Sequence, residues 1–141
     1  MRELVVELAV ALRDEVHPHL GAHAGRAHSG RGATEVGGET GDVTFAIDER
    51  AESFMESFIA ERDPSVAFYS EDRGMVAPDG HDPEWVLIVD PIDGTRPALA
   101  GLESCCVSVA AARLGAGEPK MGDVEVGCVI EIKSGESFVA E

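Results

Sequence analysis

The stretch from Trp85 to Gly101 reads Trp-Val-Leu-Ile-Val-Asp-Pro-Ile-Asp-Gly-Thr-Arg-Pro-Ala-Leu-Ala-Gly. Its first five residues, 85–89, form a continuous apolar run rich in β-branched side chains, which is typical of a strand buried on both faces. The run ends at Asp90 and Asp93. Two carboxylates three residues apart at the end of a buried strand repel each other unless a cation or hydrogen-bond donors neutralise them. The stretch therefore predicts a charged site at the tip of a central strand.

The residues after the second aspartate predict a turn and a short helix. Gly94 permits a turn that a side chain would block, and Thr95 can cap a helix in whose first turn Pro97 is tolerated. The free N–H groups of that helix would point to the region beside the aspartates and favour an anion there. Carboxylates for a hard cation and a helix N-terminus for a phosphate together predict a metal-dependent phosphate site.

Two further acidic motifs precede this stretch. Gly41-Asp42-Val43-Thr44 is followed by Asp48, and a short apolar strand at 66–69 leads into Ser70-Glu71-Asp72-Arg73-Gly74. Taken alone, Asp48 is better explained as a charge that complements a helix dipole, and acids at a strand end are usually solvated. If the two strands are neighbours, however, Glu71 brings a third carboxylate to the same edge, and three carboxylates suit Mg²⁺ better than a soft metal.

These three motifs, in this order and approximate spacing, resemble the inositol monophosphatase family, which also contains archaeal fructose-bisphosphatases and nucleotide-phosphate phosphatases. The resemblance covers nearly the whole chain. It implies a phosphoric monoester hydrolase that uses Mg²⁺ to hydrolyse inositol monophosphate or a related sugar phosphate. The alternatives are a fructose-1,6-bisphosphatase, a nucleotide 3′-phosphate phosphatase or, in another class, a non-catalytic metal-binding or regulatory half-domain.

The resemblance also implies a metal site. Glu71, Asp90 and the carbonyl of Ile92 would hold one Mg²⁺ ion, and Asp90 and Asp93 would share a second. A complete site of the family would take two or three ions. The donors are carboxylate and carbonyl oxygens, which are the ligands that Mg²⁺ prefers.

Catalytic and phosphate-binding roles follow from the same resemblance. Thr95, oriented by Asp48, would take a proton from the attacking water, with Glu71 as a further catalytic residue. The backbone N–H groups of Gly94 and Thr95 would bind the phosphate. Arg96 departs from the family pattern, and it either reaches a second phosphate of the substrate or lies in solvent.

Family members are considerably longer than this sequence. Residues 1–141 are therefore expected to form a single domain that resembles the N-terminal, metal-binding half of the family. The second half, which supplies a further metal-binding aspartate and most substrate contacts, would be absent. A homodimer or a missing C-terminal segment is expected to complete the fold.

Composition limits the partners. The 141 residues include 27 acidic and 11 basic side chains, for a formal net charge of −16. Nucleic acid and anionic membrane surfaces are poor partners for such a chain, because Lys and Arg are needed to bind phosphate backbones. A small phosphorylated substrate remains the expected partner. The three cysteines are odd in number and have no metal-ligand spacing, so they predict free thiols in a cytoplasmic protein.

The periodicity predicts an α+β fold, with two N-terminal helices layered on a mostly antiparallel sheet. Apolar residues recur at helical spacing from Arg2 to about His19, and a second amphipathic helix ends before Asp63-Pro64. The Gly-rich segment 21–41 is expected to be a loop without regular structure. Besides the two strands named above, strands are predicted at 105–113, 126–132 and 136–140, the last two as a hairpin with an exposed edge.

Overall fold

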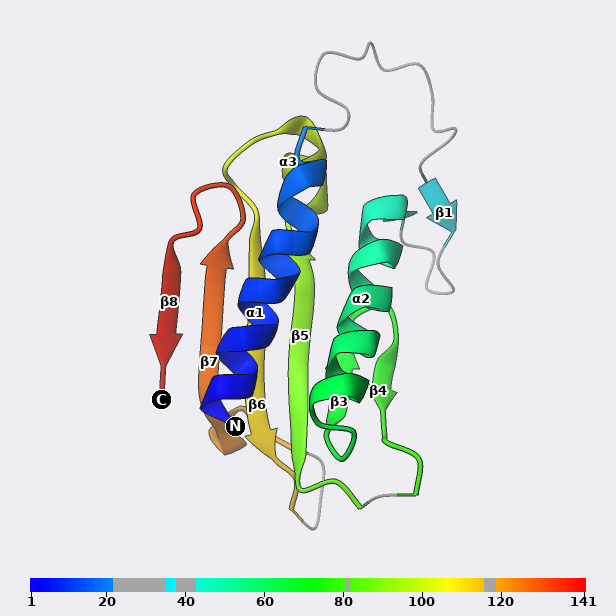
Figure 1. Cartoon of the computed structure of the whole chain (residues 1–141), viewed down its shortest axis with the longest axis vertical. Helices are drawn as coiled ribbons and strands as arrows, with labels where there is room; N and C mark the ends of the chain where they lie inside the picture. Colours follow the sequence, from blue (N-terminus) through cyan, green and yellow to red (C-terminus); the bar gives the residue numbers. More distant parts are fainter. Residues whose placement is uncertain (22–34, 38–42, 81, 116–118) are drawn as a thin grey trace.

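The chain folds into helices packed on one six-stranded sheet, in a computed structural model that describes residues 1–21, 35–37, 43–80, 82–115 and 119–141 (Figure 1). Three α-helices lie in these ranges, and two short 3₁₀ turns lie at His17–His19 and Met121–Asp123. The helices are α1 (Arg2–Val16), α2 (Ala46–Arg62) and α3 (Thr95–Ala100). The strands are β1 (Glu35–Gly37), β2 (Val43–Phe45), β3 (Ala67–Ser70), β4 (Gly74–Val76), β5 (Trp85–Asp93), β6 (Cys106–Arg113), β7 (Val124–Glu131) and β8 (Ser137–Ala140).

The six-stranded sheet has the order β4-β3-β5-β6-β7-β8, and β1 pairs with β2 in a separate two-stranded sheet. Every neighbouring pair in the larger sheet is antiparallel except β3 and β5, which run parallel. The predicted α+β class with a mostly antiparallel sheet is therefore confirmed. The parallel pair matters for function, because the carboxyl ends of β3 and β5 lie at the same edge of the sheet.

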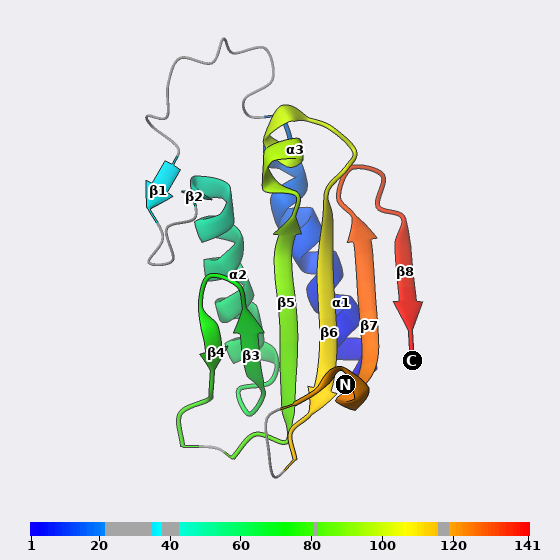
Figure 2. The ribbon, with the colours of Figure 1, turned by 180° about the vertical axis from the view of Figure 1, so that it is seen from behind.

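Helices α1 and α2 lie side by side on one face of the sheet, in front of it in Figure 1 and behind it in the reverse view of Figure 2. The buried apolar residues of α1 recur every three or four positions along one face of the helix and are fully or almost fully buried: Val5, Leu8, Leu12 and Val16. This burial along one helix face supplies much of the core. Among the described residues, no helix is long and apolar enough to cross a membrane.

Several element boundaries differ from the sequence expectation. Helix α1 ends at Val16, and the chain continues as a 3₁₀ turn because Pro18 has no N–H to donate to the α-helical ladder. Strand β5 extends past Val89 to Asp93, with a register shift between Asp90 and Asp93. The three-residue strands β1, β2 and β4 were not predicted, since pieces this short show no alternation. The expectation of no regular structure across 21–41 was thus wrong for Glu35–Gly37, and the rest of that segment lies outside the described residues.

The last strand is an exposed edge. All four residues of β8 are exposed, and 62% of the Phe138 surface is accessible. Strand β8 pairs with β7 along one side, and it is the last strand in the order of the sheet. An apolar, unpaired edge favours association with another chain or segment.

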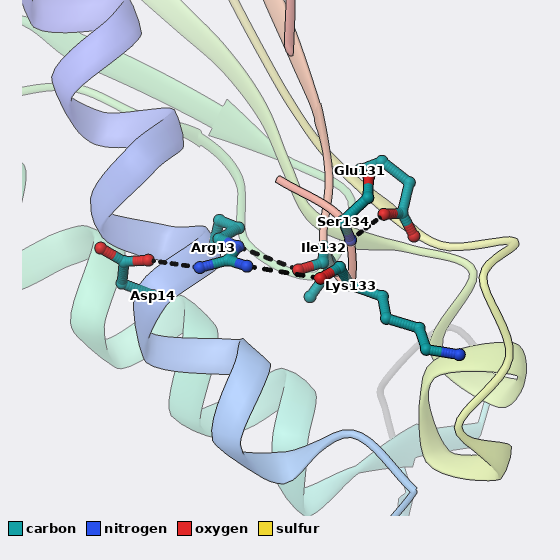
Figure 3. Close-up of polar contacts among 6 residues, drawn as sticks. All are labelled: Arg13, Asp14, Glu131, Ile132, Lys133 and Ser134. Atoms are coloured by element: carbon teal, nitrogen blue, oxygen red, sulfur yellow. Dashed lines mark hydrogen bonds and ion pairs between the residues drawn. The ribbon is translucent and has the colours of Figure 1, made fainter. Parts of the chain in front are cut away.

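Arg13 of α1 fastens the turn between β7 and β8 (Figure 3). Its Nε donates to the carbonyl of Ile132 at 2.9 Å, and its Nη2 donates to the carbonyl of Lys133 at 3.4 Å. Its third nitrogen, Nη1, pairs with the neighbouring Asp14 at 2.9 Å. The Ile132 side chain is fully buried, so the bond from Arg13 satisfies a carbonyl at the margin of the core.

Replacing Arg13 with Met should therefore destabilise the chain. The substitution keeps the length of the side chain but removes every donor, and we expect the free energy of unfolding to fall by about 1–3 kcal/mol. Urea unfolding followed by circular dichroism would measure the change. Arg50→Met is the matched control, because Arg50 pairs with Glu15 at the surface and should cost about 1 kcal/mol or less. Equal losses in the two variants would contradict a specific role for Arg13.

A left-handed glycine joins β5 to α3. Gly94 has φ +94°, and a Cβ at this position would lie 2.5 Å from the carbonyl oxygen of Ser104. Both the backbone angle and the close approach of the Ser104 carbonyl exclude a side chain. The sequence expectation that this glycine permits a turn is confirmed, and the turn sets the direction of α3.

Gly94→Ala is expected to destabilise the fold by more than about 2 kcal/mol, because it combines a positive φ with a backbone clash. Thermal unfolding would report the loss. Gly122→Ala is the control: a Cβ there meets nothing within 4 Å, and its effect should stay within about 0.5 kcal/mol. A Gly94→Ala chain as stable as the Gly122→Ala chain would show that the junction can relax.

Candidate functional site

Four carboxylates gather at the edge where β3 and β5 end. Glu71 lies in the turn after β3, Asp90 and Asp93 lie in the last part of β5, and Asp48 lies in the first turn of α2. The pKa of Asp90 is raised from 3.8 to about 6, first by burial and then by the negative charges of Asp93, Glu71 and Asp48. The structure thus brings together the four acidic residues that the sequence singled out. Burial, together with the negative charges of its neighbours, makes ionised Asp90 unfavourable at this edge.

The backbone around Asp90 partly offsets this effect. The N–H of Ile92 donates to Asp90 Oδ1 at 3.2 Å, and this bond favours the ionised form of Asp90. Ile92 itself is 5% exposed and anchors the segment in the core, whereas Asp93 is exposed. The segment therefore presents one half-buried and one solvent-facing carboxylate on either side of an apolar anchor.

Thr95 connects this edge to α2. Its hydroxyl donates to Asp48 Oδ1 at 2.8 Å, with the carbonyl of Ile92 as a second acceptor at 3.2 Å. The expected cap was wrong: Gly94 is the N-cap of α3 and Thr95 is its first residue, without a side-chain cap bond. The hydroxyl is directed to Asp48 instead, because the left-handed conformation of Gly94 turns the chain before the helix begins.

A cysteine that sequence reasoning missed also lies here. Cys106 Sγ is 3.7 Å from Asp93 Oδ2, since Cys106 opposes Asp93 in the pairing of β5 with β6. Burial, and then the charge of Asp93, raises the pKa of the Cys106 thiol to about 11. The thiol is therefore neutral at pH 7 and donates weakly to the carboxylate. Only the strand register, which the sequence does not show, could have found this contact.

The donor chemistry of this edge fits a hard divalent cation. Carboxylates and a backbone carbonyl are the oxygen ligands of Mg²⁺, and a cation would relieve the repulsion that raises the pKa of Asp90. Within the described ranges, however, His, Cys, Asp and Glu side chains do not form a group of three or more that could hold a metal ion. The compact three-carboxylate cage expected from the sequence is thus not closed among the described residues.

Asp90→Asn provides a pH-dependent test of this crowding. The folded-state pKa of Asp90, about 6, exceeds the ordinary 3.8. The folded chain therefore keeps its full free energy of unfolding below about pH 4, where Asp90 is protonated, and loses part of it as the pH rises through 6 and Asp90 must ionise. A shift of this size corresponds to about 3 kcal/mol at most. At pH 7.5 without divalent cations, Asp90→Asn should therefore unfold at a higher urea concentration than the unmodified chain.

The same comparison at pH 4 is the control, because Asp90 is then largely protonated and the two chains should differ little. Adding Mg²⁺ at pH 7.5 should stabilise only the chain that retains Asp90. If Asp90→Asn and the unmodified chain differ in stability by the same amount at both pH values, the loss of stability does not come from ionised Asp90.

The sequence of this chain matches a known protein family and several curated proteins. The profile of the Inositol monophosphatase family matches residues 2–134. An inositol-1-monophosphatase from Aeropyrum pernix is 32% identical over 96 residues, which are 68% of this chain and 33% of that protein. A bifunctional NADP phosphatase/NAD kinase from Methanococcus maripaludis is 28% identical over 150 residues, which cover all of this chain and 25% of that protein.

The fold comparison agrees. The crystal structure of the extragenic suppressor protein suhB from Bartonella henselae has a TM-score of 0.71 at 21% identity, and the match covers 99% of this chain and 47% of that one. The chain thus spans about half the length of this solved structure, and a quarter to a third of the two curated relatives. Because the family profile matches almost the full length of this chain, the chain belongs to the inositol monophosphatase family.

Proposed function

We propose that this chain carries the cation-binding and water-activating groups of a Mg²⁺-dependent phosphomonoesterase that acts on inositol monophosphate or a related sugar phosphate. One observation carries the proposal. The hydroxyl of Thr95 is hydrogen-bonded to Asp48 at 2.8 Å, and the charge of Asp48 reaches the crowded carboxylate Asp90. A hydroxyl held by a carboxylate beside an oxygen-rich cation site is an arrangement that can activate water for phosphate-ester hydrolysis.

The family is generally metal-dependent, and the donors of this edge suit Mg²⁺. Glu71, Asp90 and Asp93 would hold the ion through their carboxylates, and Ile92 would do so through its carbonyl. A bound Mg²⁺ ion supplies positive charge to the phosphate oxygens and lowers the pKa of water. The crowding around Asp90 supports this assignment, because an ionised Asp90 is unfavourable until a cation neutralises its neighbours.

Thr95 and Asp48 would move the proton of the attacking water. Because Thr95 Oγ1 donates its hydrogen to Asp48, its lone pairs are left to accept a hydrogen bond from water. As the water oxygen bonds to phosphorus and the bond from phosphorus to the ester oxygen breaks, the water proton would pass to Thr95 Oγ1 while the hydroxyl proton moves to the Asp48 carboxylate. The ester oxygen would leave as an alkoxide and take a proton from solvent. Asp48 thus serves as the final proton acceptor and also fixes the orientation of Thr95.

The start of α3 would bind the phosphate. The first backbone N–H groups of a helix have no acceptor within the helix and favour an anion. Gly94 and Thr95 stand at this position, so their N–H groups would be the donors to the phosphate. Arg96 is exposed in the first turn, where a second phosphate group could reach it.

A phosphate ester of a nucleotide is the second candidate substrate. The name of the Methanococcus maripaludis relative, which matches along this whole chain, includes NADP phosphatase. Fructose 1,6-bisphosphate is a third candidate, and a metal-binding half-domain without activity of its own is the alternative of another class. The exposed strand β8 supports a partner at that edge, either a second copy of the chain or a further segment. The three free cysteines support a reducing, cytoplasmic location.

Phosphate release by the 141-residue chain tests the proposal. With Mg²⁺, the chain should release phosphate from inositol 1-phosphate, and NADP and fructose 1,6-bisphosphate tested in parallel would identify the preferred ester. Asp93→Asn should lower the rate at least about 100-fold, since it removes one charge from the cation site. Thr95→Val should lower the rate by a similar factor but leave Mg²⁺ binding intact, because only the proton path is lost.

Asp82→Asn is the matched control, since it removes an exposed carboxylate before β5 and should leave the rate unchanged. Turnover that survives in Asp93→Asn would refute the site. Mg²⁺ binding that is lost in Asp93→Asn, without turnover in the unmodified chain, would instead favour the half-domain alternative.

A further inference from the structure

The face of α2 next to the proposed site carries a buried carboxylate that the proposed mechanism does not use. Glu52 is only 4% exposed, and its Oε2 atom is buried without a hydrogen-bond partner. The guanidinium nitrogen Nε of Arg73 is 3.9 Å from this oxygen, which is too far for a hydrogen bond. Burial raises the pKa of Glu52. Burial of a carboxylate lowers the stability of the fold. The residues that Glu52 contacts therefore indicate which role offsets this cost.

Glu52 is joined to the turn between β3 and β4. The side chain of Ser70 lies close enough to Glu52 to offset part of the rise in the Glu52 pKa that burial causes, and Ser70 is fully buried. The Ser70 hydroxyl accepts a hydrogen bond from the backbone N–H of Arg73 at 3.3 Å. Ser70 therefore connects the start of the turn to Arg73 at its end and also to Glu52 of α2. Glu71 lies between Ser70 and Arg73.

The guanidinium of Arg73 is held against the same helix. It lies 3.9 Å from Glu52 and 3.5 Å from Glu56, one turn further along α2. Arg73 follows Glu71 by two residues, and a guanidinium free to approach that carboxylate would compete with a cation for it. The buried Glu52 thus keeps the positive charge of the turn on the helix side, while the pair with the more exposed Glu56 is screened by solvent and contributes little.

We propose that Glu52 is a positioning residue for the cation site: through Ser70 and Arg73 it holds the 70–73 turn in the shape that presents Glu71 to Asp90. The inference rests on the proposed function, because it takes Glu71 as a ligand of a hard divalent cation. Glu52 itself does not contact the ion or the substrate. Its effect is expected in the affinity for the cation and in the rigidity of the turn.

Titration of the 141-residue chain with Mn²⁺, followed by electron paramagnetic resonance, tests the first effect. Glu52→Gln keeps the shape of the side chain but removes its charge, and it should weaken Mn²⁺ binding by about tenfold or more. Ser70→Ala, which removes the hydroxyl link, should act in the same direction. Glu56→Gln is the matched control, because Glu56 also lies beside Arg73 but is partly exposed, and its effect should stay within about twofold.

A double-mutant cycle separates positioning from a general loss of negative charge. If Glu52 acts through Glu71, Glu52→Gln should weaken binding in the unmodified chain but have no further effect once Glu71→Gln is present. Fully additive losses would overturn the proposal, as would an unchanged Mn²⁺ affinity in Glu52→Gln. Circular dichroism of each variant verifies that the chain is folded.

Hydrogen exchange in the metal-free chain tests the second effect independently of any cation. The Arg73 amide, which donates to Ser70 Oγ, should exchange about tenfold faster in Glu52→Gln and at an unchanged rate in Glu56→Gln. Unchanged exchange of this amide in Glu52→Gln would overturn the proposal even if Mn²⁺ binds. An unmodified chain that binds no Mn²⁺ would refute the proposed function instead, and the exchange data would still decide whether Glu52 holds the turn.

Discussion

Repulsion among carboxylates at the carboxyl end of β5 is the constraint on which the rest of this structure depends. Burial and three neighbouring negative charges raise the pKa of Asp90 to about 6, so the fold must hold an unfavourable group in place. Ile92 holds it in two ways: its backbone N–H donates to Asp90, and its side chain is buried in the core. At this end β5 still pairs with β6 as far as Asp93, and a paired strand holds the group in place better than a loop would.

One face of α2 organises both loops at this edge. Asp48, Glu52 and Glu56 are spaced four residues apart and therefore follow one another along the helix. Asp48 accepts the hydroxyl of Thr95 at the start of α3, while Glu52 and Glu56 engage the turn after β3. Because a packed helix is rigid, the positions of the two loops are coupled through it.

Much of the fold could be predicted because periodicity and turn chemistry are local properties of the chain. The apolar run from Trp85 identified the central strand, and the recurrence from Val5 to Val16 identified α1. Strand β4 was not predicted, because three residues are too few to show the alternation of a strand. The spacing of Glu52 was visible in the sequence, yet a Glu on an amphipathic helix is usually solvated, and only its burial revealed otherwise.

By itself, the sequence determined the residue types at the candidate site, the order of its motifs and the class of fold, since each follows from a local pattern. Only the tertiary structure decided which side chains meet. The Thr95 hydroxyl bonds to Asp48 across 47 positions, and Cys106 reaches Asp93 across 13. Both contacts result from helix packing and strand register, which depend on the whole core and which no short stretch of sequence encodes.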